Sequence, residues 1–236
     1  MKIYISFDME GMACVTHGWQ IPGDTFANEL REQVTDELNA IIEGAARAGA
    51  TEFYVNDTHA RANPRRVNHC IPARLHPQAL YLGGWGIPFP TVEGLDESFS
   101  ALFLVGQHAM AGHPTGDLSH TWVRTLVSVR LNEQPIGEIG LNALLAGHVG
   151  VPVALVTGDT AACEEARALL GNVETVAVKR SVGRQSAWLR NPSVVHEELR
   201  EAAYRACMQL PQLKPYRPQP PLRLSLEWTN PMLAHM

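Results

Sequence analysis

Residues 2–11 read KIYISFDMEG, and this stretch decides how the rest of the chain is interpreted. Its apolar residues Ile3, Ile5 and Phe7 alternate with other side chains, and this period of two predicts a β-strand over residues 2–8. Two acids, Asp8 and Glu10, follow at its end. In open α/β sheets, ligands bind outside the carboxyl ends of the strands, so the end of this strand is the first place to look for chemistry.

Strands and helices alternate along most of the remaining sequence. Periodicity and capping predict strands at 51–57, 101–107, 151–159 and 173–179, and helices at 27–49, at 140–150, from residue 160 onward and at 193–210. The run ALFLVGQ at 101–107 is continuously apolar, which is typical of a strand buried in a parallel sheet. The alternation predicts an α/β fold with a mainly parallel sheet flanked by helices.

Two segments depart from this alternation. VRTLVSVRL and PIGEIG flank the short turn of residues 132–134 (Asn-Glu-Gln), and they predict an inserted β-hairpin. KPYRPQPP at 214–221 predicts an extended Pro-rich linker, and LRLSLEW after it predicts a short C-terminal strand segment. We therefore expect one α/β domain over residues 1–210, followed by a Pro-rich linker and an incomplete C-terminal segment over 211–236.

Composition excludes several classes of protein. The chain has 236 residues, enough for one or two domains with a sizeable core. The formal net charge of −5 argues against a nucleic-acid-binding protein and against a polybasic membrane anchor. No apolar run is long enough to cross a membrane, and the first ten residues reach acidic side chains too early for a signal peptide. The four cysteines form no CxxC pair, so we expect reduced thiols in a cytoplasmic protein.

Potential metal ligands follow the first three predicted strands. Asp8 and Glu10 end the first, His59 follows the second, and His108 follows the third. Because the carboxyl ends of parallel strands meet at one edge of the sheet, these side chains are expected to converge. Two histidines and two carboxylates suit zinc or another divalent metal. The alternative is an ordinary sheet edge, at which polar side chains satisfy the backbone groups of loops.

Six short segments occur in a recognisable order along the chain. They are DMEG (8–11), VNDTH (55–59), VEGLDESF (92–99), GQHA (106–109), LSH (118–120) and GEIGLNA (137–143). Each is weak alone, but the ordered set is specific. Together they resemble the zinc-dependent D-aminopeptidases of the DppA type, with similar order and approximate spacing across most of residues 1–210.

The resemblance implies a centre of two zinc ions in each subunit. It implies that Asp8 bridges both ions, that Glu10 and His108 complete the first site, and that His59 and Glu138 complete the second. Three carboxylates carry a charge of −3 against +4 from two Zn²⁺, and the remaining positive charge can hold a hydroxide and polarise a carbonyl.

The resemblance also implies a catalytic role for His120, described in the family as a nucleophile. A neutral histidine beside two water-activating metals would more naturally act as a general base or acid, and the sequence leaves both roles open. Trp122, two residues later, either shapes a substrate pocket or packs in the core.

The implied activity is hydrolysis of the first peptide bond of short peptides, with D-amino-acid N-termini such as those of D-Ala-containing dipeptides. The implied assembly is a ring-like homo-oligomer with no nucleic-acid or membrane partner. Two alternatives remain: a dizinc amidase or esterase with another substrate, and a non-catalytic α/β protein that binds a metal or small ligand. The family usually continues beyond the segment that ends at residue 228, so we also expect a truncated C-terminal element.

Three further features each allow two interpretations. Asn56 and Asp57 either orient metal ligands or cap the following segment. Lys179 and Arg180 either bind a substrate carboxylate or form a solvated strand end. Residues 158–160 either bind an anion at a helix N-terminus or simply cap the helix.

Overall fold

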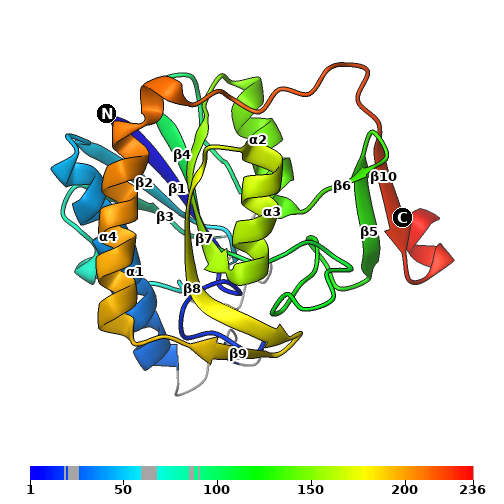
Figure 1. Cartoon of the computed structure of the whole chain (residues 1–236), viewed down its shortest axis with the longest axis horizontal. Coiled ribbons are helices and arrows are strands. Elements are labelled where there is room, and N and C mark those ends of the chain that lie inside the picture. Colours follow the sequence, from blue (N-terminus) through cyan, green and yellow to red (C-terminus); the bar gives the residue numbers. More distant parts are fainter. Residues whose placement is uncertain (19, 21–26, 60–67, 85–87, 90, 236) are drawn as a thin grey trace.

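A seven-stranded sheet forms the centre of the molecule in the computed structural model, which describes residues 1–18, 20, 27–59, 68–84, 88–89 and 91–235 (Figure 1). The strand order is β3-β2-β1-β4-β7-β8-β9, and every neighbouring pair except β8–β9 is parallel. The strands are β1 (Lys2–Phe7), β2 (Glu52–Asp57), β3 (Ala79–Leu82), β4 (Ala101–Gln107), β7 (Val153–Asp159), β8 (Glu174–Gly183) and β9 (Ser186–Leu189). The predicted α/β fold with a mainly parallel sheet is confirmed.

Four helices cover the two faces of this sheet (Figure 1). On one face lie α1 (Ala27–Arg47) and α4 (Pro192–Met208), which pack against each other and share one apolar core. On the other face lie α2 (Glu138–His148) and α3 (Thr160–Leu170), with a second core. None of the described helices combines the length and apolar character needed to span a membrane.

The alternation of side chains in β1 separates these two cores instead of separating core from solvent. Ile3, Ile5 and Phe7 contribute to the core under α1 and α4, while Tyr4 contributes to the core under α2 and α3. The side-chain hydroxyls of β1 that are buried in these cores form hydrogen bonds. The hydroxyl of Tyr4 donates to a backbone carbonyl at 2.7 Å, and that of Ser6 does the same. The strand is therefore buried on both faces, as central parallel strands usually are.

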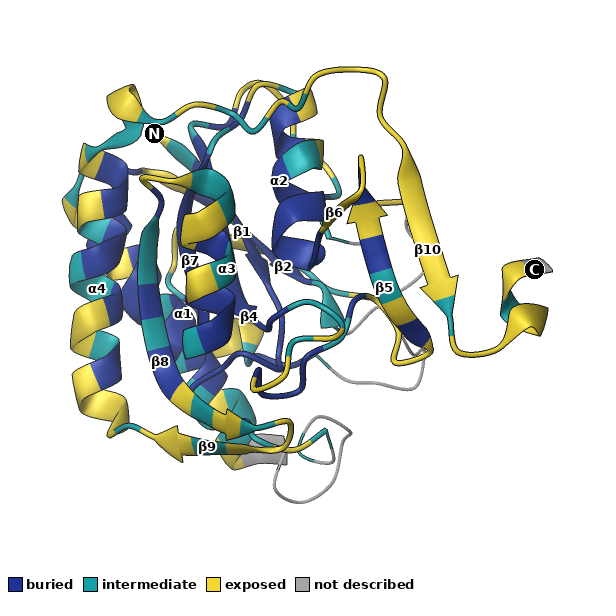
Figure 2. Cartoon of the chain, turned by 45° about the vertical axis from the view of Figure 1, so that its right-hand side comes forward, coloured by how far each residue is buried: buried dark blue, intermediate teal, exposed yellow. Residues whose placement is uncertain are grey.

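A second, three-stranded sheet stands beside the main body. It has the order β10-β5-β6, formed by β5 (Leu126–Leu131), β6 (Gln134–Pro135) and β10 (Leu224–Trp228). The predicted hairpin is present as β5–β6, but its second strand is only two residues long because the chain turns into α2 at Glu138. The C-terminal strand β10 pairs antiparallel with β5 and is largely exposed (Figure 2).

Several elements differ from the sequence-based expectation. The strands β3 and β9 lie at the two edges of the main sheet and were not predicted, because both are short and partly exposed. The helix expected at 140–150 begins two residues earlier, which brings Glu138 into its first turn. Short 3-10 turns occupy Pro72–Arg74, Leu210–Gln212 and Pro231–His235.

The ends of β1 and β4 approach each other so closely that glycine is required there. Gly106 has a φ of +66°, and a Cβ at this position would lie 2.2 Å from the carbonyl oxygen of Asp8. A Cβ on Gly11 would lie 2.0 Å from the carbonyl oxygen of Gln107. The backbone N–H of Gly11 donates to the Gly106 carbonyl at 2.7 Å. This contact sets the position of Asp8 relative to the end of β4.

We expect Gly106→Ala to lower the free energy of unfolding by about 2–5 kcal/mol, because it combines a strained left-handed residue with a backbone clash. Gly171→Ala is the matched control. Gly171 has a φ of +71°, and a Cβ there would meet nothing within 4 Å. The control should therefore lose only about 1–2 kcal/mol. Urea unfolding of both variants measures the difference, and equal losses would contradict the role assigned to the β1–β4 approach.

Candidate metal centre

The five residues proposed as metal ligands meet at one edge of the main sheet. Asp8 and Glu10 follow β1, His59 follows β2 and His108 follows β4, and these three strands are neighbours in the order β2-β1-β4. Glu138 comes from the first turn of α2, after the chain has passed through the small sheet. The convergence of the first four residues follows from parallel strand order.

Contacts between imidazole nitrogens and carboxylate oxygens link these side chains into one cluster. Nε2 of His59 lies 3.0 Å from Oε1 of Glu10. Nε2 of His108 lies 3.5 Å from Oδ2 of Asp8 and 3.3 Å from Oε1 of Glu138. One ligand atom each of Asp8, Glu10 and His108 lies within 4.8 Å of the others. The closest contacts thus join His59 to Glu10 and Glu138 to His108, and Asp8 lies near one member of each pair, Glu10 and His108.

The donor set has the free lone pairs that a metal ion needs. Nδ1 of His108 lies 3.0 Å from the carbonyl oxygen of Ala109, which can only accept, so Nδ1 carries a proton and Nε2 is the nitrogen that faces the carboxylates and can bind a metal once deprotonated. Nε2 of His108 and Oε2 of Glu10 are buried atoms with no hydrogen-bond partner. A buried polar atom without a partner costs about 1–3 kcal/mol, and a divalent cation would satisfy both atoms. These residues therefore fit a metal site.

The pKa values in the cluster show how unfavourable its bare negative charge is. Burial and the neighbouring Glu10 raise the pKa of Asp8 to about 6. Burial would lower the pKa of His108, but the charges of Glu138 and Asp8 outweigh burial and hold it well above the usual value. Burial would likewise raise the pKa of Glu10, but His59 keeps it well below its usual value. A bound metal cation would replace the protons that otherwise neutralise these side chains.

His120 lies against the cluster through a ring contact. Its imidazole stacks on that of His108, with 4.0 Å between ring centroids and 12° between planes. Its Nδ1 donates to the carbonyl of Leu118 at 2.8 Å, so Nε2 can accept a proton. Burial and the neighbouring His108 lower the pKa of His120, which keeps it neutral near pH 7. A neutral imidazole beside a group of possible metal ligands can serve as a general base.

The backbone around His120 is strained and held in place by hydrogen bonds. Leu118 has a φ of 52° and Trp122 a φ of 58°, left-handed conformations that cost about 1–3 kcal/mol each. The N–H of Leu118 donates to the Arg184 carbonyl at 2.8 Å, and the N–H of Trp122 donates to Oε1 of Glu138 at 2.7 Å. Glu138 therefore fixes the loop that carries His120 as well as contacting His108. The Trp122 side chain is 45% exposed and does not pack in the core.

Asp57 supports the cluster from behind. Its carboxylate accepts from the backbone N–H of His69 at 2.8 Å, from Nδ1 of His69 at 3.0 Å and from the hydroxyl of Tyr81 at 2.8 Å. The ring of His69 meets that of His59 edge to face, with centroids 5.1 Å apart. Of the two sequence interpretations, positioning agrees better with these contacts. No sequence signal identified His69, whose partner Asp57 is twelve residues away.

Lys179 matches neither sequence interpretation, because its side chain is fully buried. Its ammonium group donates to the carbonyl of Glu10 at 2.6 Å, to the carbonyl of Val15 and to Oδ2 of Asp117 at 2.7 Å. The residue therefore clamps the loop that bears Glu10 and is closed to a substrate. Asp159 accepts from the N–H of Ala162 at 2.7 Å, which is the capped helix start rather than an anion site.

Comparisons with known proteins identify the family of this chain. The whole chain, residues 1–236, matches the family model described as D-aminopeptidase. A D-aminopeptidase of Bacillus subtilis (strain 168) is 35% identical over 237 residues, which cover 98% of this chain and 82% of that protein. The solved structure of "Zn-dependent D-aminopeptidase DppA from Bacillus subtilis, a self-compartmentalizing protease" is similar with a TM-score of 0.91 at 35% identity, covering 98% of this chain and 82% of that one. This chain belongs to the D-aminopeptidase family.

Proposed function

We propose that this chain is a zinc-dependent aminopeptidase that removes the first residue from short peptides beginning with a D-amino acid, such as D-Ala-containing dipeptides. One observation carries the proposal. A buried cluster in a D-aminopeptidase chain turns unpartnered imidazole and carboxylate lone pairs toward one another. Such a set favours a bound cation, because three neighbouring buried carboxylates are costly without compensating positive charge.

Two zinc ions per subunit would be held by the five residues of the cluster. Asp8 is the candidate bridge, since its carboxylate lies near His108 and Glu10, which belong to different histidine–carboxylate pairs. Glu10 and His108 would complete one site, and His59 and Glu138 the other. Zinc bound there supplies a Lewis acid for the peptide carbonyl and lowers the pKa of bound water toward ~7.

His120 would handle the proton of the reaction at Nε2. The hydrogen bond from Nδ1 to the Leu118 carbonyl fixes the tautomer, and stacking on His108 fixes the ring beside the cluster. A general base that later acts as an acid can pass a proton to the leaving amine. Attack by Nε2 itself is the competing role, and the same ring placement serves it.

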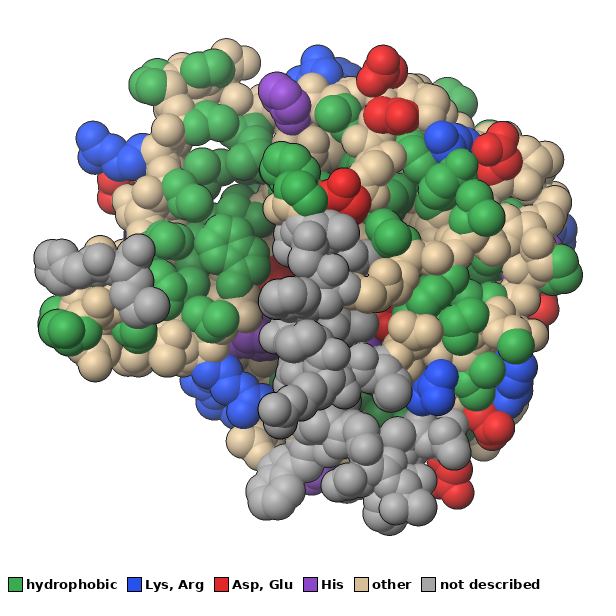
Figure 3. Space-filling view, turned by 180° about the vertical axis from the view of Figure 1, so that it is seen from behind, with side chains coloured by type: hydrophobic (Ala, Val, Ile, Leu, Met, Phe, Trp, Pro, Cys, Tyr) green, Lys and Arg blue, Asp and Glu red, His purple; other side chains and the backbone are tan. Residues whose placement is uncertain are grey.

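The protein would act as a ring-like homo-oligomer in the cytoplasm. Hydrophobic side chains gather over the lobe that carries the three-stranded sheet (Figure 3). In β10, Leu224 and Leu226 are 46% and 42% exposed, although they pair in register with the buried Leu131 and Val129 of β5. A second copy of this chain would cover that apolar edge. The four cysteines are free, which fits a reducing compartment.

Purified protein is expected to contain about two zinc ions per chain and to cleave D-Ala-D-Ala much faster than L-Ala-L-Ala or simple amides. Chelation should abolish turnover, and added Zn²⁺ should restore it. Elemental analysis and a substrate panel measure these outcomes. Bound metal without hydrolysis of any substrate would instead favour a binding protein, and preferred cleavage of simple amides would favour an amidase.

Variants sharpen the zinc test. Asp8→Asn should lose most of both metals, because it removes the proposed bridge, while His59→Ala should lose about one equivalent. Asp36→Asn is the control, since it alters only a surface ion pair with Arg74. Full zinc content in Asp8→Asn would argue against a bridging role.

For His120→Ala we expect zinc content to stay normal while kcat falls by about 10²–10⁴-fold, because a positioned proton acceptor is lost. His148→Ala, an exposed histidine in the last turn of α2, is the control and should keep full activity. Steady-state kinetics on metal-loaded protein decides the matter. A fully active His120→Ala would rule out both the base and the nucleophile.

Leu226→Asp should shift the molar mass of the native protein toward the monomer, because it places a charge in the proposed apolar contact. Val194→Asp introduces the same charge at a similarly exposed site, 49% accessible, in the first turn of α4. Light scattering after size-exclusion chromatography compares the two. An unchanged assembly in Leu226→Asp would place the subunit contact elsewhere.

A further inference from the structure

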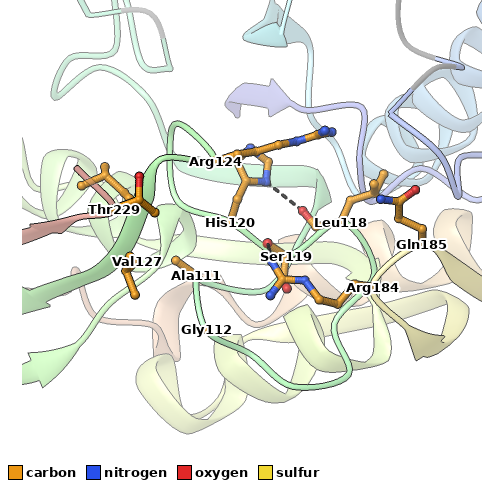
Figure 4. A pocket seen from close by; sticks show the side chains of 11 residues that line it. Ala111, Gly112, Leu118, Ser119, His120, Arg124, Val127, Arg184, Gln185 and Thr229 are labelled. Atoms are coloured by element: carbon orange, nitrogen blue, oxygen red, sulfur yellow. Dashed lines mark hydrogen bonds between the residues drawn. The ribbon is translucent and has the colours of Figure 1, made fainter. Parts of the chain in front are cut away.

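A cavity of about 300 Å³ opens beside His120 (Figure 4). It lies between the loop that precedes β5 and the turn between β8 and β9. This volume is at the lower end of the range for small-ligand sites, ~300–1,000 Å³, so the cavity suits a ligand of a few residues at most. Ala111 and Val127 give it an apolar part.

The charged side chains that line the cavity are positive. Arg124 and Arg184 line it, and no aspartate or glutamate is among those lining residues that the structure describes. Within the described part of the chain, neither guanidinium forms an ion pair with a carboxylate, whereas Arg190 and Arg200 on the outer surface each do. Two cations that face a small cavity, with no carboxylate partner among the described residues, favour an anionic ligand.

The two arginines reach the cavity from different elements. Arg184 donates from Nη2 to the Ser119 carbonyl at 3.1 Å, and this bond holds its guanidinium beside the segment that contains His120. The remaining N–H groups of the guanidinium stay available to a ligand. Arg124 extends past His120 in the close view (Figure 4). The guanidinium of Arg124 packs closely against Gly18, since a Cβ added at Gly18 would lie only 2.4 Å from Nη2 of Arg124.

The cavity adjoins the candidate metal centre through one side chain. His120 lines the cavity and at the same time stacks on His108. A peptide whose first carbonyl lies at the cluster would therefore carry its following residue past His120 and into the cavity. In a dipeptide that residue ends in a free carboxylate.

We propose that Arg124 and Arg184 bind the C-terminal carboxylate of a short peptide substrate in this cavity. The proposal rests on the function proposed above and names the feature that the site selects, a free carboxylate close to the cleaved bond. A guanidinium matches a carboxylate with two parallel hydrogen bonds, so two arginines discriminate strongly between an acid and its amide. Substrate carboxylate recognition thus falls to these two residues and not to the buried Lys179.

The test compares D-Ala-D-Ala with its C-terminal amide. The native enzyme should prefer the acid by at least about tenfold in kcat/KM. Arg124→Gln should lower kcat/KM for the acid by about 10- to 100-fold, mainly through KM, and leave the amide nearly unchanged. Arg184→Gln also removes the hydrogen bond to the Ser119 carbonyl beside His120, so it should lower kcat/KM for both substrates, and by a larger factor for the acid than for the amide. Arg167→Gln is the matched control. It removes an exposed guanidinium of α3 that donates to the Thr175 hydroxyl, and it should change kcat/KM for neither substrate.

A binding measurement separates this proposal from the proposed function. Calorimetry with an unreactive dipeptide analogue, in which a methyleneamine replaces the scissile amide, reports binding of its acid and amide forms without turnover. Tighter binding of the acid, lost in both arginine variants, supports the site even if hydrolysis fails. Equal binding of acid and amide, or equal losses for both in the variants, overturns it.

Discussion

Three carboxylates buried at one edge of a parallel sheet are the constraint on which this structure depends. Asp8, Glu10 and Glu138 are almost completely removed from water, and the pKa of Asp8 rises to about 6 because of burial and its acidic neighbour. Such an arrangement persists only if positive charge compensates it. The imidazoles of His59 and His108 contact these carboxylates, and two buried atoms without a hydrogen-bond partner leave room for cations to supply the positive charge.

The backbone around these acids is fixed by elements far away in the sequence. Lys179 of β8 holds the carbonyls of Glu10 and Val15, and the carboxylate of Glu37 in α1 accepts the N–H of Ala13 at 3.0 Å. Gly106 adds the close contact between the ends of β4 and β1. Because these supports come from several elements, the geometry of the centre depends on the integrity of the whole domain, as preorganised sites generally do.

Glu138 connects the charge cluster to the loop that carries His120. Its carboxylate contacts His108 and also holds the Trp122 backbone, so it links the centre to the strained loop of His120. Arg184, at the far side of that loop, accepts the Leu118 N–H and donates to the Ser119 carbonyl. One loop therefore places the proposed proton carrier between the centre and the cavity lined by two arginines, an arrangement that would couple the proposed chemistry to selection of the substrate.

The sequence by itself determined the class of the fold and the edge of the sheet at which the polar residues meet. Alternating strands and helices require a mainly parallel sheet, and the carboxyl ends of its neighbouring strands bring Asp8, His59 and His108 together. Glu138 entered only through resemblance to a family, because no strand end predicts a helix turn that follows an inserted hairpin. Tertiary structure alone decided that Lys179 is a buried clamp, that β10 pairs with β5, and that two arginines share a cavity. The physical reason is that these contacts join residues many tens of positions apart, and local periodicity carries no record of such pairings.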